Sequence, residues 1–264
     1  MPSRISWTRQ QLLVAFSLYC KMPFGKLHSR NPEIIKYAGL LGRTPSALAM
    51  KLTNIASIDP AITATGRKGL KGASKADRQM WEEMQDGWEH FVIQSENAIN
   101  EVLSKASIKN SITPDDQDSA KEQQDYTGEN KIVTSTTRVG KSFFRKAVLS
   151  AYGNKCCITG LSVPQLLVAS HIVPWSVDRE NRLNPRNGLS LSMLHDKAFD
   201  SGLITIDRNM LVCVSKRKTI PKNDTFFISA LQDYHGKPIF QPEKFQPHRD
   251  FLAYHRDNIF ERNL

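Results

Sequence analysis

The chain has 264 residues, of which 40% are apolar and 23% are charged, and its formal net charge is +10. This length allows one large or two modest domains, and the apolar fraction is sufficient for a hydrophobic core. No run approaches the roughly 20 apolar residues that a membrane-spanning helix needs, which argues against a membrane partner. The first ten residues, MPSRISWTRQ, lack the apolar segment of a signal peptide, so we expect a cytoplasmic protein.

The charge is unevenly distributed along the chain. Residues 1–75 hold 12 Lys and Arg against 2 Asp and Glu, and residues 132–264 hold 19 against 11. The intervening residues 76–131 hold 5 against 13. Two basic blocks separated by an acidic segment indicate two surfaces that meet a polyanion, and nucleic acid is the first candidate.

The cysteines indicate neither a zinc knuckle nor a disulfide framework. The four are Cys20, Cys156, Cys157 and Cys213, and none forms a C-x-x-C pair. We expect reduced thiols in or near a core, as is usual in a reducing compartment.

Residues 1–92 are predicted to form a helical domain. Thr8 and Gln11 have the spacing of a capping box at the start of a first helix. A second helix fits residues 32–41, because its apolar positions fall on one side. Residues 42–44 form a short turn, after which a third helix is expected.

This helix–turn–helix spacing predicts a unit that binds double-stranded DNA. Thr44 is the expected N-cap of the third helix and Pro45 its first residue. The residues expected to enter a major groove or to contact phosphates are Arg43, Ser46, Met50, Lys51 and Asn54. The alternative is a plain three-helix bundle without DNA contacts.

Residues 93–131 are polar and acidic and are predicted to form a flexible linker that lets the flanking domains reorient. Residues 132–264 are the predicted second domain. Its expected elements are an amphipathic helix over 141–152, a strand at 156–160, a strand over 166–173, a short helix over 193–201 and a strand over 203–207.

Two stretches of this second domain carry the candidate chemistry, ASHIVPW at residues 169–175 and NGLSLSMLHDKAFD at residues 187–200. Asn187 follows His171 by 16 residues, and His195 follows Asn187 by 8. With the apolar residues around them, these residues resemble the HNH nuclease motif, in the form found in many restriction endonucleases. The resemblance covers about residues 138–210. It implies a ββα-metal nuclease domain, so that the whole chain would be an α+β protein.

The resemblance implies that His171 is the general base, Asn187 the residue that orients the loop, and His195 a metal ligand. The chemistry of these side chains agrees with the roles. A neutral imidazole, with a pKa of about 6.5, is a suitable base at neutral pH. Taken singly, each residue also has an ordinary structural explanation: a hydrogen-bonded histidine, a turn asparagine and a histidine on a helix surface.

The chain departs from the family pattern at two points. Many family members have Asp or His immediately before the base, where this chain has Ser170, and a neutral hydroxyl is a poor ligand for a hard cation. Asp200 is the candidate that would assist. The C-x-x-C zinc pairs that brace many members are also absent. Mg²⁺ is the expected divalent metal, and Mn²⁺, Ni²⁺ and Zn²⁺ are the alternatives.

The sequence therefore predicts a metal-dependent HNH endonuclease that cleaves DNA, with a role in restriction or DNA defence that rests on the resemblance alone. Cations expected to hold phosphates beside the cut are Arg179, Arg182, Arg186 and Lys197. One such site cuts one strand, so a homodimer is expected for double-strand cleavage. The alternatives are a homing or nicking endonuclease, a DNA-binding regulator with an inactive HNH fold, and an RNA nuclease.

Overall fold

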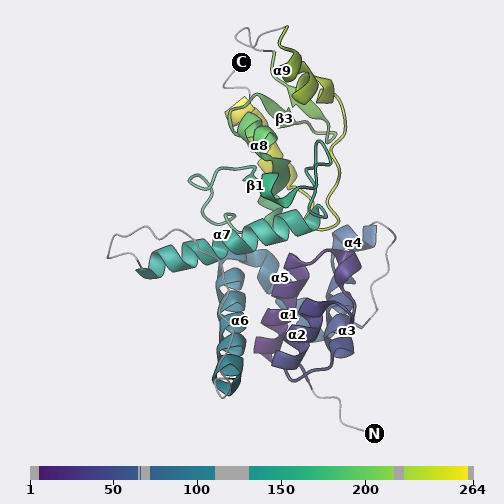
Figure 1. Ribbon diagram of the computed structural model, residues 1–264, viewed down its shortest axis with the longest axis vertical. Helices are drawn as coiled ribbons and strands as arrows, with labels where there is room; N and C mark the ends of the chain where they lie inside the picture. Colours follow the sequence, from purple (N-terminus) through teal and green to yellow (C-terminus); the bar gives the residue numbers. More distant parts are fainter. Residues whose placement is uncertain (1–5, 65, 67–71, 111–130, 217–222, 261–264) are drawn as a thin grey trace.

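The computed structural model describes residues 6–64, 66, 72–110, 131–216 and 223–260. In these residues an N-terminal helical region precedes a C-terminal half with two small antiparallel sheets, which confirms the predicted α+β class (Figure 1). The N-terminal helices are α1 (Arg9–Lys21), α2 (Pro32–Leu40), α3 (Pro45–Ala56), α4 (Pro60–Ala64), α5 (Lys75–Asp86) and α6 (Trp88–Asn110).

The C-terminal half begins with the long helix α7, which lies between the N-terminal helices and the small sheets (Figure 1). Its elements are α7 (Lys131–Ala151), β1 (Leu167–His171), β2 (Gly188–Ser192), α8 (Met193–Asp200), β3 (Ile204–Ile206), β4 (Val212–Val214), α9 (Thr225–Ala230) and α10 (Arg249–His255). Short 3₁₀ turns cover Phe24–Lys26, Pro164–Leu166, Pro185–Asn187 and Gln232–Tyr234, and a π-helical turn covers Arg256–Phe260.

The predicted helix starts are confirmed by their capping hydrogen bonds. At α1 the Thr8 hydroxyl accepts from the Gln11 backbone N–H at 3.2 Å, and the Gln11 side chain accepts from the Thr8 N–H at 3.2 Å. At α3 the Thr44 hydroxyl accepts from the Ala47 N–H at 3.2 Å, and Pro45 occupies the first helical position. Both caps satisfy backbone donors that a helix leaves unpaired.

The linker predicted over residues 93–131 is wrong for residues 93–110, which continue α6. Ala98, Ile99 and Val102 are buried, so this polar segment still carries an apolar face that packs on the core. Residue 131 already belongs to α7. The part of the predicted linker over residues 111–130 lies outside the described residues.

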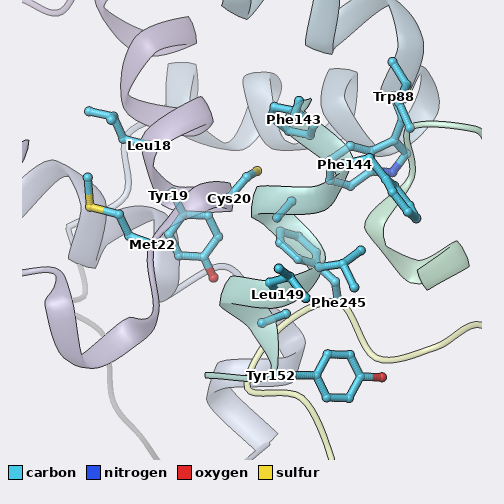
Figure 2. Close-up of a cluster of buried hydrophobic side chains, with 14 of the residues drawn as sticks. Leu18, Tyr19, Cys20, Met22, Trp88, Phe143, Phe144, Leu149, Tyr152 and Phe245 are labelled. Atoms are coloured by element: carbon cyan, nitrogen blue, oxygen red, sulfur yellow. The ribbon is translucent and has the colours of Figure 1, made fainter. Parts of the chain in front are cut away.

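The two regions share one hydrophobic core in the described part of the chain (Figure 2). The ring of Phe143 in α7 lies 6.5 Å from that of Phe91 in α6, in an edge-to-face arrangement. Phe245, near the C-terminus, packs 5.5 Å from Trp88 and 6.4 Å from Tyr19. The expectation that the two predicted domains reorient freely is therefore not met, because reorientation would break this packing.

A buried lysine adds a polar tie between the same regions. Lys244 is fully buried, and its Nζ donates to the backbone carbonyls of Tyr19, of Cys20 at 3.2 Å and of Met22 at 2.6 Å, at the end of α1. Burial lowers the pKa of Lys244 to about 8. These carbonyls are ones that a helix C-terminus leaves unpaired, so the C-terminal segment caps α1.

The larger sheet of the C-terminal half is the antiparallel pair β1–β2, and β3–β4 form the other. The strand predicted at residues 156–160 is wrong, because these residues form turns in which Gly160 has a φ of 75°. The Cys157 N–H nevertheless donates to the Ser190 carbonyl at 2.7 Å, so the turn is tied to β2. All four cysteines are free thiols, three of them buried.

Within the described residues, no helix has the length and apolar character needed to cross a membrane.

Candidate active site

The candidate site lies where the pair β1–β2 packs against α7. His171 ends β1, and its partner across the pair is Gly188. A Cβ atom at residue 188 would lie 2.4 Å from Cγ2 of Val148 and 2.9 Å from Cζ of Phe144. Only glycine therefore lets α7 approach the end of β1 this closely.

The His171 ring is held by two aromatic contacts. It stacks on Phe144 of α7, with ring centroids 3.9 Å apart and planes 7° from parallel, and Trp175 meets it edge-to-face at 5.5 Å. Its Nε2 lies 2.9 Å from the Arg182 carbonyl oxygen. A carbonyl only accepts, so Nε2 carries the hydrogen and Nδ1 keeps its lone pair. No described residue hydrogen-bonds to Nδ1.

The surroundings of His171 favour the neutral ring. Burial is the largest cause and lowers the pKa of His171, and the nearby charge of Lys141 lowers it further. The Arg182 carbonyl and the Asp196 carboxylate act in the opposite direction. Because the net shift is downward from 6.5, the ring is neutral at pH 7 and able to accept a proton.

A pocket of about 460 Å³ opens beside this ring. Two of its lining residues are cations one turn apart on α7, Lys141 and Arg145, which the sequence pattern did not single out. Arg145 donates to the Leu167 carbonyl at 2.8 Å, and Lys141 lies 5.4 Å from the centroid of the Trp175 ring. The complete lining is Lys141, Phe144, Arg145, Val168, Ala169, His171 and Trp175. A base beside two cations is an arrangement suited to a phosphate ester.

Asn187 is fully buried and fastens the loop that follows β1. Its Oδ1 accepts from the Val173 N–H at 2.8 Å, and its Nδ2 donates to the carbonyls of Val173 at 3.1 Å and Asn181 at 3.3 Å. The Ile172 N–H donates to the Asn187 backbone carbonyl at 3.0 Å. This amide therefore fixes the chain immediately after His171, which is the loop that the resemblance expects Asn187 to orient.

His195 does not face the pocket that His171 lines. It is only 4% exposed, its Nδ1 lies 2.8 Å from the Ser192 hydroxyl, and Tyr234 packs edge-to-face on its ring at 5.6 Å. Its Nε2 is buried and has no hydrogen-bond partner among the described residues. Burial lowers its pKa. His195 is not among the residues that line the pocket at His171, so the structure does not place the two rings in one pocket, and its role as a metal ligand stays a prediction.

Two aspartates lie on α8, the helix that also carries His195. Asp196 and Asp200 are four residues apart and therefore lie on one face of the helix. Burial, and then the charge of Asp196, raise the pKa of Asp200. The charge of Asp196 also acts on His171, which connects this face of α8 with the end of β1. A carboxyl whose pKa is raised by a neighbouring carboxylate, as that of Asp200 is, gains from a cation between the two.

Ser170 is 2% exposed, and its hydroxyl is buried without a partner among the described residues. As the neighbour of His171 in a strand, it points to the opposite face of β1. The expectation that it is a metal ligand is therefore not supported. The described residues contain no group of three or more His, Cys, Asp or Glu side chains able to hold a metal ion.

The four cations expected beside the cut occupy different places. Arg179 and Lys197 are exposed. Arg182 donates from Nε to the Trp175 carbonyl at 2.9 Å and lies 5.1 Å from the centroid of that indole ring. Arg186 lines a separate cavity between the N-terminal helices and the C-terminal segment and not the pocket at His171.

Two of the expected DNA contacts of the N-terminal region are engaged within the protein. Lys51 is 6% exposed and pairs with the fully buried Asp77 of α5, with Nζ 2.7 Å from Oδ1. Arg43 donates to Gln11 at 2.7 Å and lies 4.7 Å from the centroid of the Trp7 ring. The structure leaves Lys51 little access to a phosphate, because its side chain is buried and paired with Asp77.

The remaining residues predicted on α3 divide by exposure. Ser46 and Met50 are exposed, with Met50 at 51%. Asn54 is half-buried, and its Oδ1 is buried close to Gly72. The N-terminal half of α3 is thus the part that is free to meet a partner.

The site belongs to an α+β protein and combines a histidine at the end of a β-strand, a loop fastened by a buried asparagine and a short helix that follows. A family model described as HNH endonuclease matches residues 156–207, so the chain carries an HNH endonuclease domain. This part of the chain is similar to HNH nucleases, which act on DNA and generally use a divalent metal. No curated protein sequence matches the chain.

Proposed function

We propose that this protein is a metal-dependent endonuclease that hydrolyses phosphodiester bonds in double-stranded DNA. The observation that carries the proposal is the free Nδ1 of His171, at the edge of a pocket that also presents Lys141 and Arg145. A base and two cations around one cavity are what an in-line attack on a phosphate needs. A role in restriction or DNA defence is part of the proposal and rests on the domain family.

His171 accepts the proton of the attacking water at Nδ1 while Nε2–H stays bonded to the Arg182 carbonyl. This bond and the stacking on Phe144 keep the ring in one orientation, so the lone pair points in a fixed direction. The water oxygen then forms a bond to phosphorus as the ester P–O bond breaks. Lys141 and Arg145 stabilise the charge on the non-bridging oxygens.

The donor set on α8 fits a hard divalent cation. Mg²⁺ is commonly held by one or two carboxylates, with waters and a substrate phosphate completing its shell, and Asp196 and Asp200 supply two carboxylates. Mn²⁺ suits the same oxygens, whereas Ni²⁺ and Zn²⁺ would favour an imidazole ligand. When bound, the metal would neutralise charge on the phosphate and on the leaving oxygen.

The N-terminal region contributes to DNA binding in this proposal through the exposed start of α3. Ser46 and Met50 would face the groove, and the exposed Arg179 and Lys197 would contact phosphates next to the domain. One site cuts one strand, so we also propose that two copies act together when both strands are cut.

The test is cleavage of supercoiled plasmid, modified or unmodified in its bases, with Mg²⁺, Mn²⁺ or EDTA. His171→Ala should lose about 100-fold or more in rate, since a positioned base contributes at least that much. His28→Ala is the matched control, because His28 is exposed and far along the chain from the site. Equal rates for the two variants would refute the role of His171.

The metal ligands are tested by binding as well as by rate. Asp196→Asn and Asp200→Asn should weaken Mn²⁺ binding, measured by calorimetry on the protein alone, and should raise the Mg²⁺ concentration needed for half-maximal cleavage. Asp257→Asn is the control, because Asp257 is an exposed carboxylate outside α8. Unchanged Mn²⁺ binding in both α8 variants would overturn this ligand assignment.

One alternative has an observation in its favour. A DNA-binding regulator with an inactive HNH fold would account for the buried His195 and for Ser170, neither of which is available to a metal. The plasmid assay separates the two functions, because a regulator binds DNA without cutting it in any of the metals.

A further inference from the structure

A second basic pocket lies at the other end of the C-terminal half. It is a cavity of about 140 Å³ between the turn that joins β3 to β4 and the segment around α10. Its lining residues are Asp207, Arg208, Met210, Arg249, Leu252 and Arg256. None of them lines the pocket at His171, so the two pockets are separate sites.

Three arginines line this cavity, one from the β3–β4 turn and two from the helical run that starts with α10. Arg256 is fixed by a hydrogen bond from Nη1 to the Ile206 carbonyl at 3.0 Å. Arg208 and Arg249 are exposed, and neither forms an ion pair with any described residue. Like charges brought together in this way repel each other unless an anion lies between them.

The one carboxylate in the lining is already engaged by the backbone. Oδ1 of Asp207 accepts from the N–H groups of Asn209 at 2.8 Å and Leu211 at 2.7 Å, and so it holds the turn between β3 and β4. The lining as a whole therefore keeps an excess of two positive charges, counted from three arginines and one aspartate.

The size of the cavity restricts what it can hold. A volume of about 140 Å³ corresponds to four or five waters at ~30 Å³ each, which suits a phosphate group with some hydration. It is below the ~300 Å³ at which pockets for whole small molecules begin, so a nucleoside does not fit inside. Guanidinium groups match phosphate oxygens with paired hydrogen bonds, which lysines do not.

We propose that this three-arginine pocket binds one backbone phosphate of the DNA, at a position away from the phosphate that is cut. The proposal rests on the proposed function for the identity of the ligand. The pocket would fix the register of the duplex on the nuclease domain, and it would contribute equally to every DNA sequence.

The experiment measures binding of a DNA duplex to the full chain by fluorescence anisotropy in EDTA, over a series of salt concentrations. The variant Arg208→Ala/Arg249→Ala removes two exposed guanidiniums and leaves Arg256 and its structural hydrogen bond in place. Loss of one phosphate contact should reduce the slope of log K against log salt by about 0.9. At 0.1 M salt this corresponds to an affinity about eightfold weaker, which is 10 raised to the power 0.9.

Matched variants separate the pocket from general charge. Arg78→Ala/Lys155→Ala removes two exposed cations from α5 and from the turn after α7, and it should change the slope by less than the pocket variant. Arg249→Lys keeps the charge but loses the paired hydrogen bonds, so it should retain most of the slope and lose part of the affinity. Unchanged thermal unfolding shows that each variant is folded.

Free anions form the second arm of the test. Inorganic phosphate should compete with DNA in the wild-type protein and less effectively in the pocket variant. The proposal would be overturned if the pocket binds inorganic phosphate while the slope of log K against log salt for DNA is the same in the wild type and the pocket variant. It would also be overturned if this slope changes equally in the control variant. Failure of the nuclease proposal would give a different result. The protein would not cut DNA, while its DNA binding and the slope of log K against log salt would be intact.

Discussion

Replacing Gly188 with alanine tests how the end of β1 is held against α7. The new Cβ would lie 2.4 Å from Cγ2 of Val148 and 2.9 Å from Cζ of Phe144, where carbon atoms normally meet at about 3.5–4.0 Å. Both neighbours are buried, so α7 or β2 has to move by about 1 Å. Overpacking of this kind costs about 1–3 kcal/mol, and two contacts this short indicate the upper end, about 3 kcal/mol.

The measurement is thermal unfolding. For a chain of this size about 1 kcal/mol shifts the midpoint by ~2–4 °C, so Gly188→Ala should lower it by roughly 6–12 °C. Gly39→Ala is the control, because residue 39 lies inside α2 and a Cβ atom added there would have nothing within 4 Å. Alanine at this position should stabilise the helix by up to about 1 kcal/mol. A Gly188→Ala protein that melts within about 2 °C of the wild type would refute the packing argument, since that is less than the shift expected from ~1 kcal/mol.

Three further predictions concern the base, a buried ion pair and the products of cleavage. The acid limb of the pH profile of kcat/KM should lie below pH 6.5, because burial lowers the pKa of His171 and a base acts only when neutral. Lys141→Gln removes a charge that lowers this pKa, so the variant should move the limb to higher pH. A limb that moves to lower pH would contradict this assignment. Asp77→Ala should lower the free energy of unfolding, measured by chemical denaturation, by about 3–5 kcal/mol, because it leaves Lys51 buried and unpaired. Lys51→Met/Asp77→Leu should recover most of that loss. Equal losses in the two variants would show that the ion pair does not determine the effect. Supercoiled plasmid should become nicked before it becomes linear, with the linear product favoured at higher protein concentration, and linear product formed without a nicked stage would contradict a single-strand cut by one site.

The parts of the fold that sequence predicted well depend on near neighbours. The caps at Thr8 and Thr44 involve residues three positions away, and the short helix α8 ends beside Gly202, which has a φ of 65°. The strand predicted over residues 166–173 is β1, which ends at His171, two residues earlier than predicted. In each case the deciding interaction lies within a few residues, so a local pattern is enough to predict it.

The parts that sequence predicted poorly depend on distant partners. Lys51 is neutralised by Asp77, 26 residues further along the chain, and His195 is covered by Tyr234, 39 residues further along. A helix of eight residues such as α8 gives no periodicity from which to choose the face that turns inward. Residues 93–110 have the polar composition of a linker, yet a few apolar residues on one face are enough to bury a helix against a core that already exists.

The shared core leads to a prediction about the nuclease domain by itself. A chain cut to residues 132–264 would expose Phe143 and Phe245, which are 1% and 5% exposed in the whole chain, and would remove the three carbonyls that pair with Lys244. Each phenylalanine contributes about 1.5–3 kcal/mol on burial, and a buried ammonium that loses its acceptors adds to the loss. We therefore expect this piece to aggregate or to unfold without cooperativity, and to recover a sharp transition when residues 1–110 are added. A piece that unfolds alone at the midpoint of the whole chain would show that the N-terminal helices are not part of the nuclease fold.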